Sequence, residues 1–219
     1  MAVATLAAGM AHEIKNPLTS IKTFAEYLPE KYDDPNFRNN FQRIVVEEVD
    51  RVNSIVKQLL DFSKPQELIL EKKSVKEIID ETLMLMNSDF LNNGINLIKD
   101  YQDQGYILVD RKLLKQAFLN VFLNNIQAMP NGGMLKVQVR KENEYIKITL
   151  SDTGCGISNE NLKQIFNPFF TTKESGTGLG LSIVKSIIEQ HKGIITYTSE
   201  LGKGTTTLIL LPISSLMVN

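Results

Sequence analysis

The chain has 219 residues, of which 42% are hydrophobic and 22% are charged, enough for one or two globular domains with cores of their own. Its formal net charge is −1 and it has no block of like charges, which argues against nucleic acid as a partner. The single cysteine, Cys155, excludes an internal disulfide and fits a reducing compartment, so we expect a cytoplasmic location.

No apolar run approaches the ~18 residues that a membrane span needs, and we expect no membrane contact from this segment. The start, Met1 to Met10, is apolar but lacks a basic leader, so we interpret it as the first turns of a helix rather than a signal peptide. Because it lies so close to the motif at His12, we expect the chain to be the C-terminal part of a longer protein. That expectation leaves room for a membrane anchor outside this segment.

The first predicted helix, from about Ala2 to Leu28, has one apolar seam suited to a partner helix. The seam residues recur at steps of four and three: Met10, Ile14, Pro17, Ile21, Phe24 and Leu28. We expect this helix to stop at Pro29, because proline cannot donate a backbone hydrogen bond.

His12 is predicted to lie on the opposite side of this helix from the seam, about 200° round from Met10 at ~100° per residue. Its imidazole should therefore face solvent, with Asn16 one turn later on the same face. Pro17 crowds the carbonyl of Glu13, which predicts a kink beside the histidine. Taken alone, an exposed histidine on a helix is more often a solvated surface residue than a nucleophile.

A second helix is predicted to start at Pro35, behind the capping residues Asp33 and Asp34, and to end near Ser63. Its apolar positions again recur at threes and fours: Phe41, Val45, Val49, Val52, Val56, Leu59 and Phe62. Two amphipathic helices joined by a short turn form a hairpin. Since a lone hairpin cannot bury both stripes, we expect a homodimer with a four-helix bundle. A coiled-coil spacer would explain the stripes but not the His-Glu-x-x-Asn group.

After Pro65 the pattern changes to strands mixed with helices, with several antiparallel hairpins, which indicates an α+β fold rather than a doubly wound sheet. Strands are predicted over 68–70, 95–101, 106–109, 135–140, 145–150, 194–198 and 205–211. Helices are predicted over 74–87, 110–129, 158–166 and 177–192, with caps at Ser74 and Asp110 and a stop at Gly193. We therefore expect a helical hairpin over 1–65 and a second domain over 66–219.

Two asparagines four residues apart, Asn120 and Asn124, share one face of an otherwise apolar predicted helix. Amide oxygens suit a hard cation such as Mg²⁺, which keeps waters and phosphate oxygens among its ligands. By itself this spacing is weak evidence for a metal site.

The motif Asp152-Thr153-Gly154-Cys155-Gly156 follows directly after a predicted strand. An ionised carboxylate only accepts hydrogen bonds, so Asp152 can take the exocyclic amine of adenine. Gly154 and Gly156 permit positive φ and close backbone approach. A plain polar turn is the alternative, and Cys155 is interpreted as a small filler.

Next, Asn167-Pro168-Phe169-Phe170-Thr171-Thr172-Lys173 runs into Gly176-Thr177-Gly178-Leu179-Gly180. Glycines that feed a helix N-terminus make an anion site from free N–H groups and the helix dipole. We interpret the polar segment between as a lid, which Phe169 and Phe170 pin unless they are simply core. Lys173 can meet a terminal phosphate as a point charge.

Two familiar phosphate motifs do not fit. Gly176 to Gly180 reads G-x-G-x-G rather than G-x-G-x-x-G, and the glycines around Lys203 lack the spacing of a P-loop. A turn between the last two strands is predicted there instead. His191 falls in the last turn of a predicted helix, where a partial positive charge would favour the dipole, and we assign it no function.

Together these motifs resemble the core of bacterial-type sensor histidine kinases, in order and spacing, over nearly the whole chain. The matching boxes are the phosphoacceptor box His12 to Pro17, the asparagine box Asn120 to Asn124, the first glycine box Asp152 to Gly156, the phenylalanine box Pro168 to Phe170 and the second glycine box Gly176 to Gly180. The resemblance implies a dimerisation and phosphotransfer hairpin, followed by an ATP-binding domain with the Bergerat-type α/β sandwich.

By position, the resemblance implies that His12 takes the γ-phosphate of ATP, with Glu13 as its general base. The phosphoryl group would then pass to an aspartate of a response regulator receiver domain. Asn16 would place a water when that partner is dephosphorylated.

The resemblance also assigns the nucleotide contacts. Asp152 would hold adenine, Asn124 would bind Mg²⁺, and Asn120 would support phosphate or metal. The remaining implied contacts to the nucleotide are Gly154, Gly156, Phe170, Lys173, Gly176, Thr177, Gly178, Leu179 and Gly180.

Two positions depart from the family's pattern, since Asn125 stands where a small residue is frequent and Gln127 where an acid is common. One alternative is an ATP hydrolase or chaperone resembling gyrase, mismatch-repair or heat-shock ATPases, but those carry Glu where Asn120 stands. A second is a non-catalytic dimeric scaffold that senses ATP, against which the His12-Glu13 pair argues.

Overall fold

The computed structural model describes residues 2–63, 67–103, 105–173 and 176–213, and all side chains within these except those of residues 2–13, 54 and 57–63. The chain forms two compact units. The helical unit comprises Met1–Gln66 with Pro168–Leu179, and the sheet unit comprises Glu67–Asn167 with Gly180–Asn219. None of the helices in the described part of the chain combines the length and the apolar character of a membrane span.

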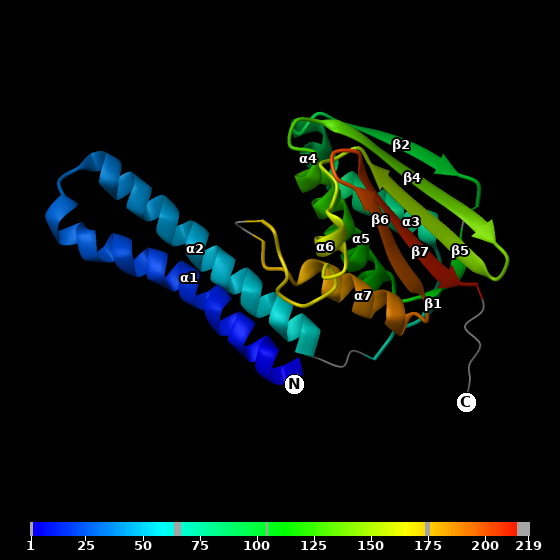
Figure 1. The fold of residues 1–219 in the computed structure, drawn as a ribbon, viewed down its shortest axis with the longest axis horizontal. Coiled ribbons are helices and arrows are strands. Elements are labelled where there is room, and N and C mark those ends of the chain that lie inside the picture. The colour runs from blue at the N-terminus through cyan, green and yellow to red at the C-terminus, as the bar shows by residue number, and fades with distance from the viewer. Residues whose placement is uncertain (1, 64–66, 104, 174–175, 214–219) are drawn as a thin grey trace. The chain divides into compact units, whose positions relative to one another are not determined.

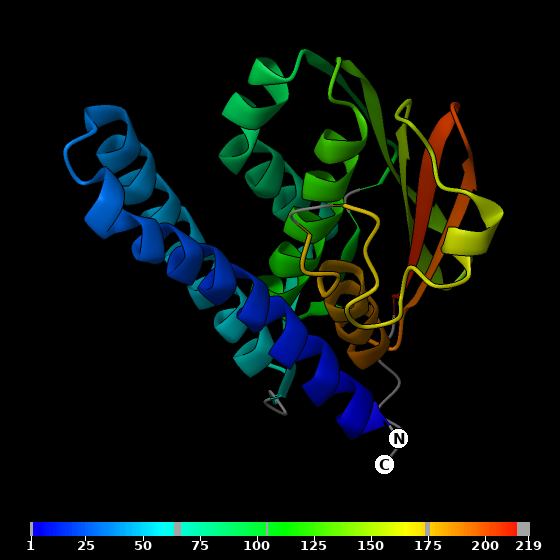
Figure 2. The same ribbon diagram turned by 60° about the vertical axis from the view of Figure 1, so that its left-hand side comes forward.

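The predicted hairpin is present in the helical unit, where α1 (Ala2–Lys31) and α2 (Pro35–Ser63) lie side by side (Figures 1 and 2). The turn is capped as predicted, because the Asp34 carboxylate accepts a hydrogen bond from the Asn36 N–H at 2.9 Å. The predicted stop at Pro29 is wrong, since α1 continues to Lys31. A proline removes only its own bond to the carbonyl four residues earlier, so the N–H groups that follow it can still bond within the helix.

The predicted seam of α1 is confirmed for the residues whose side chains are described. Pro17 is buried and the seam positions on either side of it are half-buried, whereas Lys15 and Asn16 are exposed. Phe24 of α1 and Phe37 of α2 stack with ring centroids 6.1 Å apart. The side chains of Met10, Leu59 and Phe62 lie outside the described residues, and the kink at Pro17 stays a prediction.

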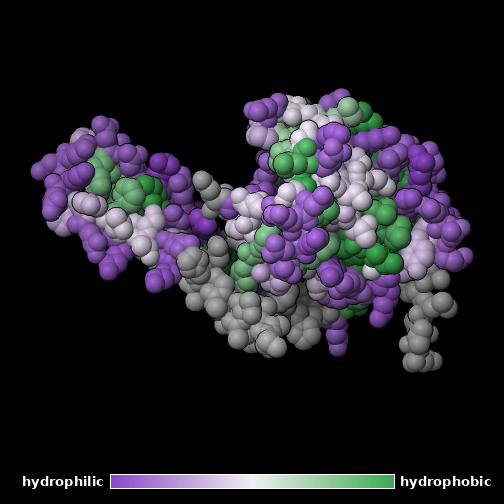
Figure 3. Space-filling model, in the orientation of Figure 1, coloured by the Kyte–Doolittle hydropathy of each residue, from purple (hydrophilic) through white to green (hydrophobic). Residues whose placement is uncertain are grey.

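The predicted apolar stripe of α2 is only partly buried. Ile55, which the stripe omitted, is 1% exposed, while Val49 and Val56 are 45% and 39% exposed. The helix therefore has two neighbouring apolar stripes, of which the valine stripe consists of Val45, Val49, Val52 and Val56. Figure 3 shows apolar side chains interrupting the hydrophilic surface of the hairpin.

The sheet unit is built on a five-stranded sheet in the order β2-β4-β5-β7-β6, in which β2 and β4 run parallel and the other pairs antiparallel. The strands are β2 (Ile95–Tyr101), β4 (Gly133–Glu142), β5 (Tyr145–Asp152), β6 (Ile194–Glu200) and β7 (Gly204–Pro212). One face is covered by α3 (Val75–Leu85), α5 (Arg111–Ala128) and α7 (Gly180–Gln190), as Figures 1 and 2 show. The predicted fold class, a helical hairpin followed by an α+β sandwich, is confirmed.

The predicted strand at 68–70 is wrong. A separate two-stranded sheet pairs β1 (Glu71–Ser74) with β3 (Tyr106–Val109), and its register begins with Glu71 opposite Val109. The backbone N–H of Ile69 instead donates to the Asp110 carboxylate at 3.1 Å. Pairing therefore begins at Glu71, opposite Val109, the last residue of the four-residue strand β3.

Three helical boundaries also differ from prediction. The helix expected over 74–87 ends at Leu85, and a separate helix, α4 (Asn87–Asn92), follows Met86. The helix expected over 158–166 shrinks to α6 (Asn159–Leu162). The helix expected from 177 begins at Gly180, because Gly178 has a φ of +65° and interrupts the helical conformation. The caps at Ser74 and Asp110 and the turn at 201–203 are confirmed.

Candidate functional site

At one end of the sheet, the face that the helices cover changes from apolar to polar. Three buried aliphatic residues of β5 are followed by Asp152, which is 6% exposed. The register places Thr205 of β7 opposite Asp152, and Thr207 of β7 opposite Tyr197 of β6. Burial raises the pKa of the Tyr197 phenol. A buried polar cluster of this kind is unusual in a sheet core and marks the end of the sheet as a candidate site.

Three N–H donors hold the carboxylate of Asp152. Its Oδ1 accepts hydrogen bonds from the backbone N–H groups of Gly154 at 2.9 Å and Thr205 at 3.1 Å. Its Oδ2 accepts from Nδ2 of Asn125 on α5 at 2.8 Å. A carboxylate offers about four lone-pair sites, so one acceptor position remains for a further donor. These bonds fix the direction in which that acceptor points.

The loop after β5 lies directly against α5 and β6, and its glycines make this possible. A Cβ at Gly154 would lie 2.6 Å from the carbonyl oxygen of Ala128, to which the Cys155 N–H donates at 2.9 Å. Gly156 has a φ of +70°, and a Cβ there would collide with the carbonyl of Glu200. The predicted need for positive φ and close backbone approach is thus met, and the neighbour that is approached is the protein's own backbone.

One of the two predicted asparagines, Asn120, lies near the start of α7. Asn120 and Asn124 are half-buried on α5, which packs along α7. A Cβ placed at Gly180, the first residue of α7, would lie 3.9 Å from the side-chain amide carbon of Asn120. The first N–H groups of a helix lack intrahelical partners and attract anions. This junction therefore combines amide oxygens with an anion-binding helix end, which fits phosphate with Mg²⁺.

In the part of the chain that the structure describes, His, Cys, Asp and Glu side chains form no cluster of three that could hold a metal ion.

The predicted phosphoacceptor residues belong to α1. His12 and Glu13 have side chains outside the described residues, so the outward imidazole stays a prediction. Asn16, four residues after His12, is exposed, and Pro17 beside it is buried. The backbone of α1 is helical through this stretch, so His12 and Asn16 are one turn apart.

The predicted lid is a loop of the helical unit whose two ends close on each other. The Phe169 N–H donates to the Gly178 carbonyl at 3.0 Å, and both residues have a φ of +65°. A Cβ at Gly178 would lie 2.4 Å from the carbonyl carbon of Phe169. The other residues predicted to contact nucleotide from this segment lie between these ends or beside them: Phe170, Lys173, Gly176, Thr177 and Leu179.

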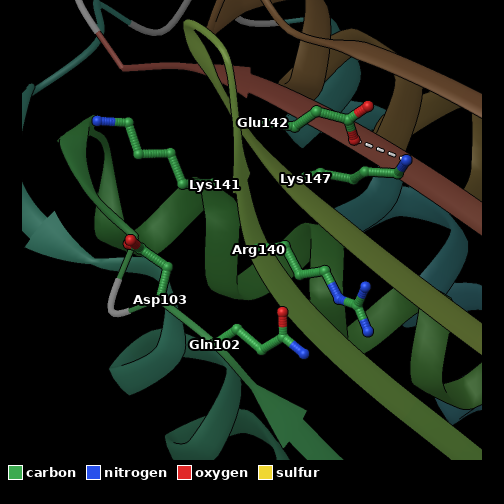
Figure 4. Close-up of a pocket in the computed structure, with 6 residues that line it drawn as sticks. All are labelled: Gln102, Asp103, Arg140, Lys141, Glu142 and Lys147. Atoms are coloured by element: carbon green, nitrogen blue, oxygen red, sulfur yellow. Dashed lines mark ion pairs between the residues drawn. The ribbon is translucent and has the colours of Figure 1, made fainter.

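An open pocket of about 550 Å³ lies near the start of β5, whereas Asp152 is the last residue of that strand. It is lined by Gln102, Asp103, Arg140, Lys141, Glu142 and Lys147 (Figure 4). Two of its cations are paired, since Lys147 contacts Glu142 at 2.7 Å and Arg140 contacts Asp100 at 3.3 Å. Because Lys147 and Asp152 are five residues apart on β5, about 17 Å at about 3.3 Å per residue, this pocket is separate from the polar cluster.

Two family models match the chain. Residues 2–68 match the His Kinase A (phospho-acceptor) domain. Residues 109–215 match the Histidine kinase-, DNA gyrase B-, and HSP90-like ATPase family. The chain belongs to the histidine kinases.

Curated kinases align along nearly all of this chain. Sensor histidine kinase ZraS of Escherichia coli (strain K12) is 39% identical over 98% of the chain and 46% of that protein. Sporulation kinase C of Bacillus subtilis (strain 168) is 35% identical over 96% of the chain and 49% of that protein. The chain thus spans about half the length of these relatives. The solved structure of histidine kinase ThkA in complex with response regulator protein TrrA has a TM-score of 0.82 and 29% identity, covering 96% of this chain and 61% of that one.

In this histidine kinase, the residue that the sequence analysis undervalued is Asn125. It is 4% exposed and lies four residues after the buried Val121, so it continues the apolar stripe of α5. An amide at a stripe position predicts a buried hydrogen-bond partner, and that signal was available in the sequence. Thr205 and Thr207 were missed as well, because only the strand register places Thr205 opposite Asp152 and Thr207 opposite Tyr197.

His191 is a structural residue of the kinase and not a helix-end cation. Its Nε2 accepts from the Asp110 N–H at 2.9 Å, so its Nδ1 bears the proton and donates to the Ile187 carbonyl at 2.7 Å. Burial lowers the pKa of His191 below its ordinary value of 6.5. The predicted favourable charge at the end of this helix is therefore absent at neutral pH.

Proposed function

We propose that this chain is the catalytic core of an ATP-dependent protein histidine autokinase. The hairpin over 1–65 is its dimerisation and phosphotransfer domain, and residues 66–219 are its ATP-binding domain. The observation that supports this most directly is the buried Asp152, held by three N–H donors at the polar end of the sheet. The match of both halves to histidine kinase families supports the same assignment.

In the proposed site, Asp152 accepts a hydrogen bond from the amino group of adenine. The phosphates reach the junction of Asn120 with the start of α7, where unpaired helix N–H groups attract anions. Asn124 binds Mg²⁺, which when bound neutralises phosphate charge as it does in other phosphoryl transfers. The polar segment that joins the phenylalanine motif to the glycine motif beginning at Gly176 is the lid, and Lys173 meets the terminal phosphate.

In the proposed reaction, a ring nitrogen of His12 attacks the γ-phosphorus of ATP, the bond to the bridging oxygen breaks, and ADP leaves. An imidazole with an ordinary pKa is largely neutral at pH 7 and keeps a free lone pair for this attack. Glu13 accepts the proton from the other ring nitrogen. The phosphoryl group then passes to an aspartate of a response regulator, as suggested by the complex of ThkA with the response regulator TrrA.

The proposal includes a homodimer. The valine stripe of α2 leaves Val49 and Val56 45% and 39% exposed, at the i, i+7 spacing of a helix–helix interface. Pairing two hairpins would bury this stripe in a four-helix bundle. The single cysteine, Cys155, supports the expectation that the segment works in the cytoplasm, whether or not the longer protein is anchored in a membrane.

The deciding experiment is incubation of the chain with γ-labelled ATP and Mg²⁺. Autokinase activity gives a label on the protein that is lost in acid and stable in base, and the His12→Ala variant shows no label. A label that survives His12→Ala would overturn the assignment of His12. Phosphate release without any labelled protein would instead favour the hydrolase alternative.

Asn16 is tested separately from His12. The Asn16→Ala variant should keep most of its autophosphorylation but lose dephosphorylation of the phosphorylated response regulator, because its proposed role is to place the attacking water. Equal loss of both activities would mean that Asn16 only supports the helix. The exposed neighbour Lys15, changed to Ala, is the matched control.

The dimer is tested by light scattering on the purified chain. Val49→Glu with Val56→Glu should shift the protein to monomer, because the charges would lie inside the proposed bundle. Val46→Glu is the matched control, since Val46 is 55% exposed on α2 but lies off the stripe. A monomeric parent chain would contradict the proposal.

A further inference from the structure

One polar atom beside Asp152 has no protein partner. The carbonyl oxygen of the Asn125 side chain, Oδ1, is fully buried and makes no hydrogen bond with any described residue. Buried side-chain acceptors are paired in the large majority of cases, and an unpaired one calls for a partner that is not part of the chain. The residue is 4% exposed as a whole, so the bulk solvent does not satisfy it.

The orientation of this amide is fixed by its neighbour. Asp152 is bonded to N–H donors at both oxygens and so acts as an acceptor on each. Turning the amide over would place Oδ1 against Oδ2 of Asp152, setting two acceptors face to face. The NH₂ group of Asn125 must therefore point at Asp152, and the free atom is the carbonyl oxygen.

Asp152 and Asn125 together hold acceptor positions that no described residue fills. Asp152 has one lone-pair position left on its carboxylate, and Asn125 adds the lone pairs of Oδ1 on the same amide group that Asp152 holds at 2.8 Å. An amino group has two N–H bonds and can satisfy both acceptors. The six-position of adenine carries such an amino group, whereas the same position of guanine or hypoxanthine carries an oxygen that only accepts.

We propose that Asn125 is a specificity-determining residue of the nucleotide site, whose side-chain carbonyl accepts a hydrogen bond from the amino group of a 6-aminopurine. This inference rests on the proposed function and deepens it, because it assigns base selection to a pair of residues instead of Asp152 alone. The six-position oxygen of a 6-oxopurine is itself an acceptor, so it would face the acceptors of Asp152 and Asn125 and leave both without a hydrogen bond. Binding sites discriminate most strongly against a ligand that leaves their buried polar groups unpaired.

The test compares ATP with inosine triphosphate, whose base has an oxygen at the six-position, on the complete 219-residue chain by titration calorimetry with Mg²⁺. In Asn125→Ala, the affinity for ATP should fall by about threefold to tenfold, the range of one neutral hydrogen bond. The affinity for inosine triphosphate should stay within about twofold of that of the parent chain. The variant loses an acceptor that repels the six-position oxygen, and it also loses the packing of the Asn125 side chain, so the two effects oppose each other. The ratio of the two affinities is the readout, because a loss of stability alone moves both nucleotides together.

Matched variants separate this role from packing. Gln116→Ala changes another amide on α5, nine residues away, and should leave the ratio unchanged. Asn125→Ser gives the same comparison if the alanine variant does not fold. If both Asn125 variants bind ATP and show the same ratio of ATP affinity to inosine triphosphate affinity as the parent chain, the inference is overturned. A parent chain that does not bind ATP at all would overturn the proposed function itself.

Discussion

The sheet unit contains two buried aspartates with similar bonding and different surroundings. Asp110 is 8% exposed and Asp152 is 6% exposed, and each carboxylate accepts three N–H donors. The donors to Asp110 are the backbone groups of Ile69, Lys112 and Leu113. The donors to Asp152 are the backbone groups of Gly154 and Thr205 and the side chain of Asn125.

The difference lies in what stands next to each carboxylate. Beside Asp110, the ring of His191 uses both nitrogens within the protein. Beside Asp152, the carbonyl of Asn125 has no partner among the described residues. The carboxylate of Asp110 thus caps a helix and joins two segments of the chain, whereas the carboxylate of Asp152 forms part of a candidate binding site. The neighbouring unsatisfied acceptor distinguishes the two roles better than the carboxylate itself.

The largest expected effect separates these two aspartates. Asp152→Ala should weaken ATP binding by at least about 100-fold, roughly 2.7 kcal/mol, because both the base acceptor and the bonds that place its loop are lost. Asp110→Ala should leave the dissociation constant within about threefold but lower the free energy of unfolding by about 2 kcal/mol, through loss of a helix cap and of the Ile69 bond. Calorimetric titration and denaturant unfolding measure the two quantities. Equal losses of ATP affinity in the two variants would contradict the assignment of different roles to Asp152 and Asp110.

A second prediction concerns the loop that joins Asp152 to α5. Gly154→Ala should lower the free energy of unfolding by about 2 kcal/mol, because its Cβ would lie 2.6 Å from the Ala128 carbonyl and the loop or the helix would have to shift. ATP affinity should fall as well, since a shift of the loop would displace the N–H of residue 154 that donates to Asp152. Cys155→Ala is the control, because that side chain is exposed and its backbone bond would remain. An unchanged free energy of unfolding in Gly154→Ala would show that the close approach to the Ala128 carbonyl does not require glycine.

A third prediction sharpens the Asp110 side of the comparison through pH. His191 is neutral when folded, with its pKa lowered by burial, so the unfolded chain takes up a proton below pH 6.5 that the folded chain resists. Stability should therefore decrease as the pH falls below that value, by at most about 1.4 kcal/mol per pH unit. His191→Gln should flatten this part of the profile, while Lys192→Gln, at an exposed neighbour, should not. Denaturant unfolding from pH 7.5 to 5.5 gives the curve, and an unchanged slope in His191→Gln would contradict the assignment.

The smallest expected effects lie at the charged pocket on the far end of β5. Lys147→Ala removes a partly exposed ion pair with Glu142 and should change the free energy of unfolding by less than about 1 kcal/mol. The affinity for ATP should be unchanged, because the pocket is separate from the Asp152 cluster. A clear loss of ATP binding in this variant would move the candidate site to the opposite end of the strand.

The sequence allowed much of the fold to be predicted, because periodicity and caps are local properties. The seam of α1, the cap at Asp34 and the strand predicted over 145–150 all follow from neighbouring residues, although the structure extends that strand to Asp152. The strand at 68–70 was predicted wrongly because pairing is decided by the four residues of β3, about 35 positions later. The start of α7 was missed because Gly178 adopts a positive φ, which sequence spacing does not reveal.

The candidate site was predictable in its residues but not in its bonding. Asp152, Asn120 and the glycines were found as motifs, yet the partner of Asp152 was overlooked. Asn125 and Asp152 are 27 positions apart and meet only because α5 packs on β5. The assignment of His191 failed for a similar reason, since its partner Asp110 is 81 positions away.

The bond between Ile69 and Asp110 has a mechanical consequence. The chain enters the sheet unit at Glu67, and the first described hydrogen bond after that point runs from Ile69 to the residue that caps α5. A pull on this connecting segment would load that single bond, and next the four-residue ladder of β1 with β3, before any strand of the larger sheet bears force. Tension would thus reach α5 at its first turn, and α5 is the helix whose later turns hold Asn120, Asn124 and Asn125.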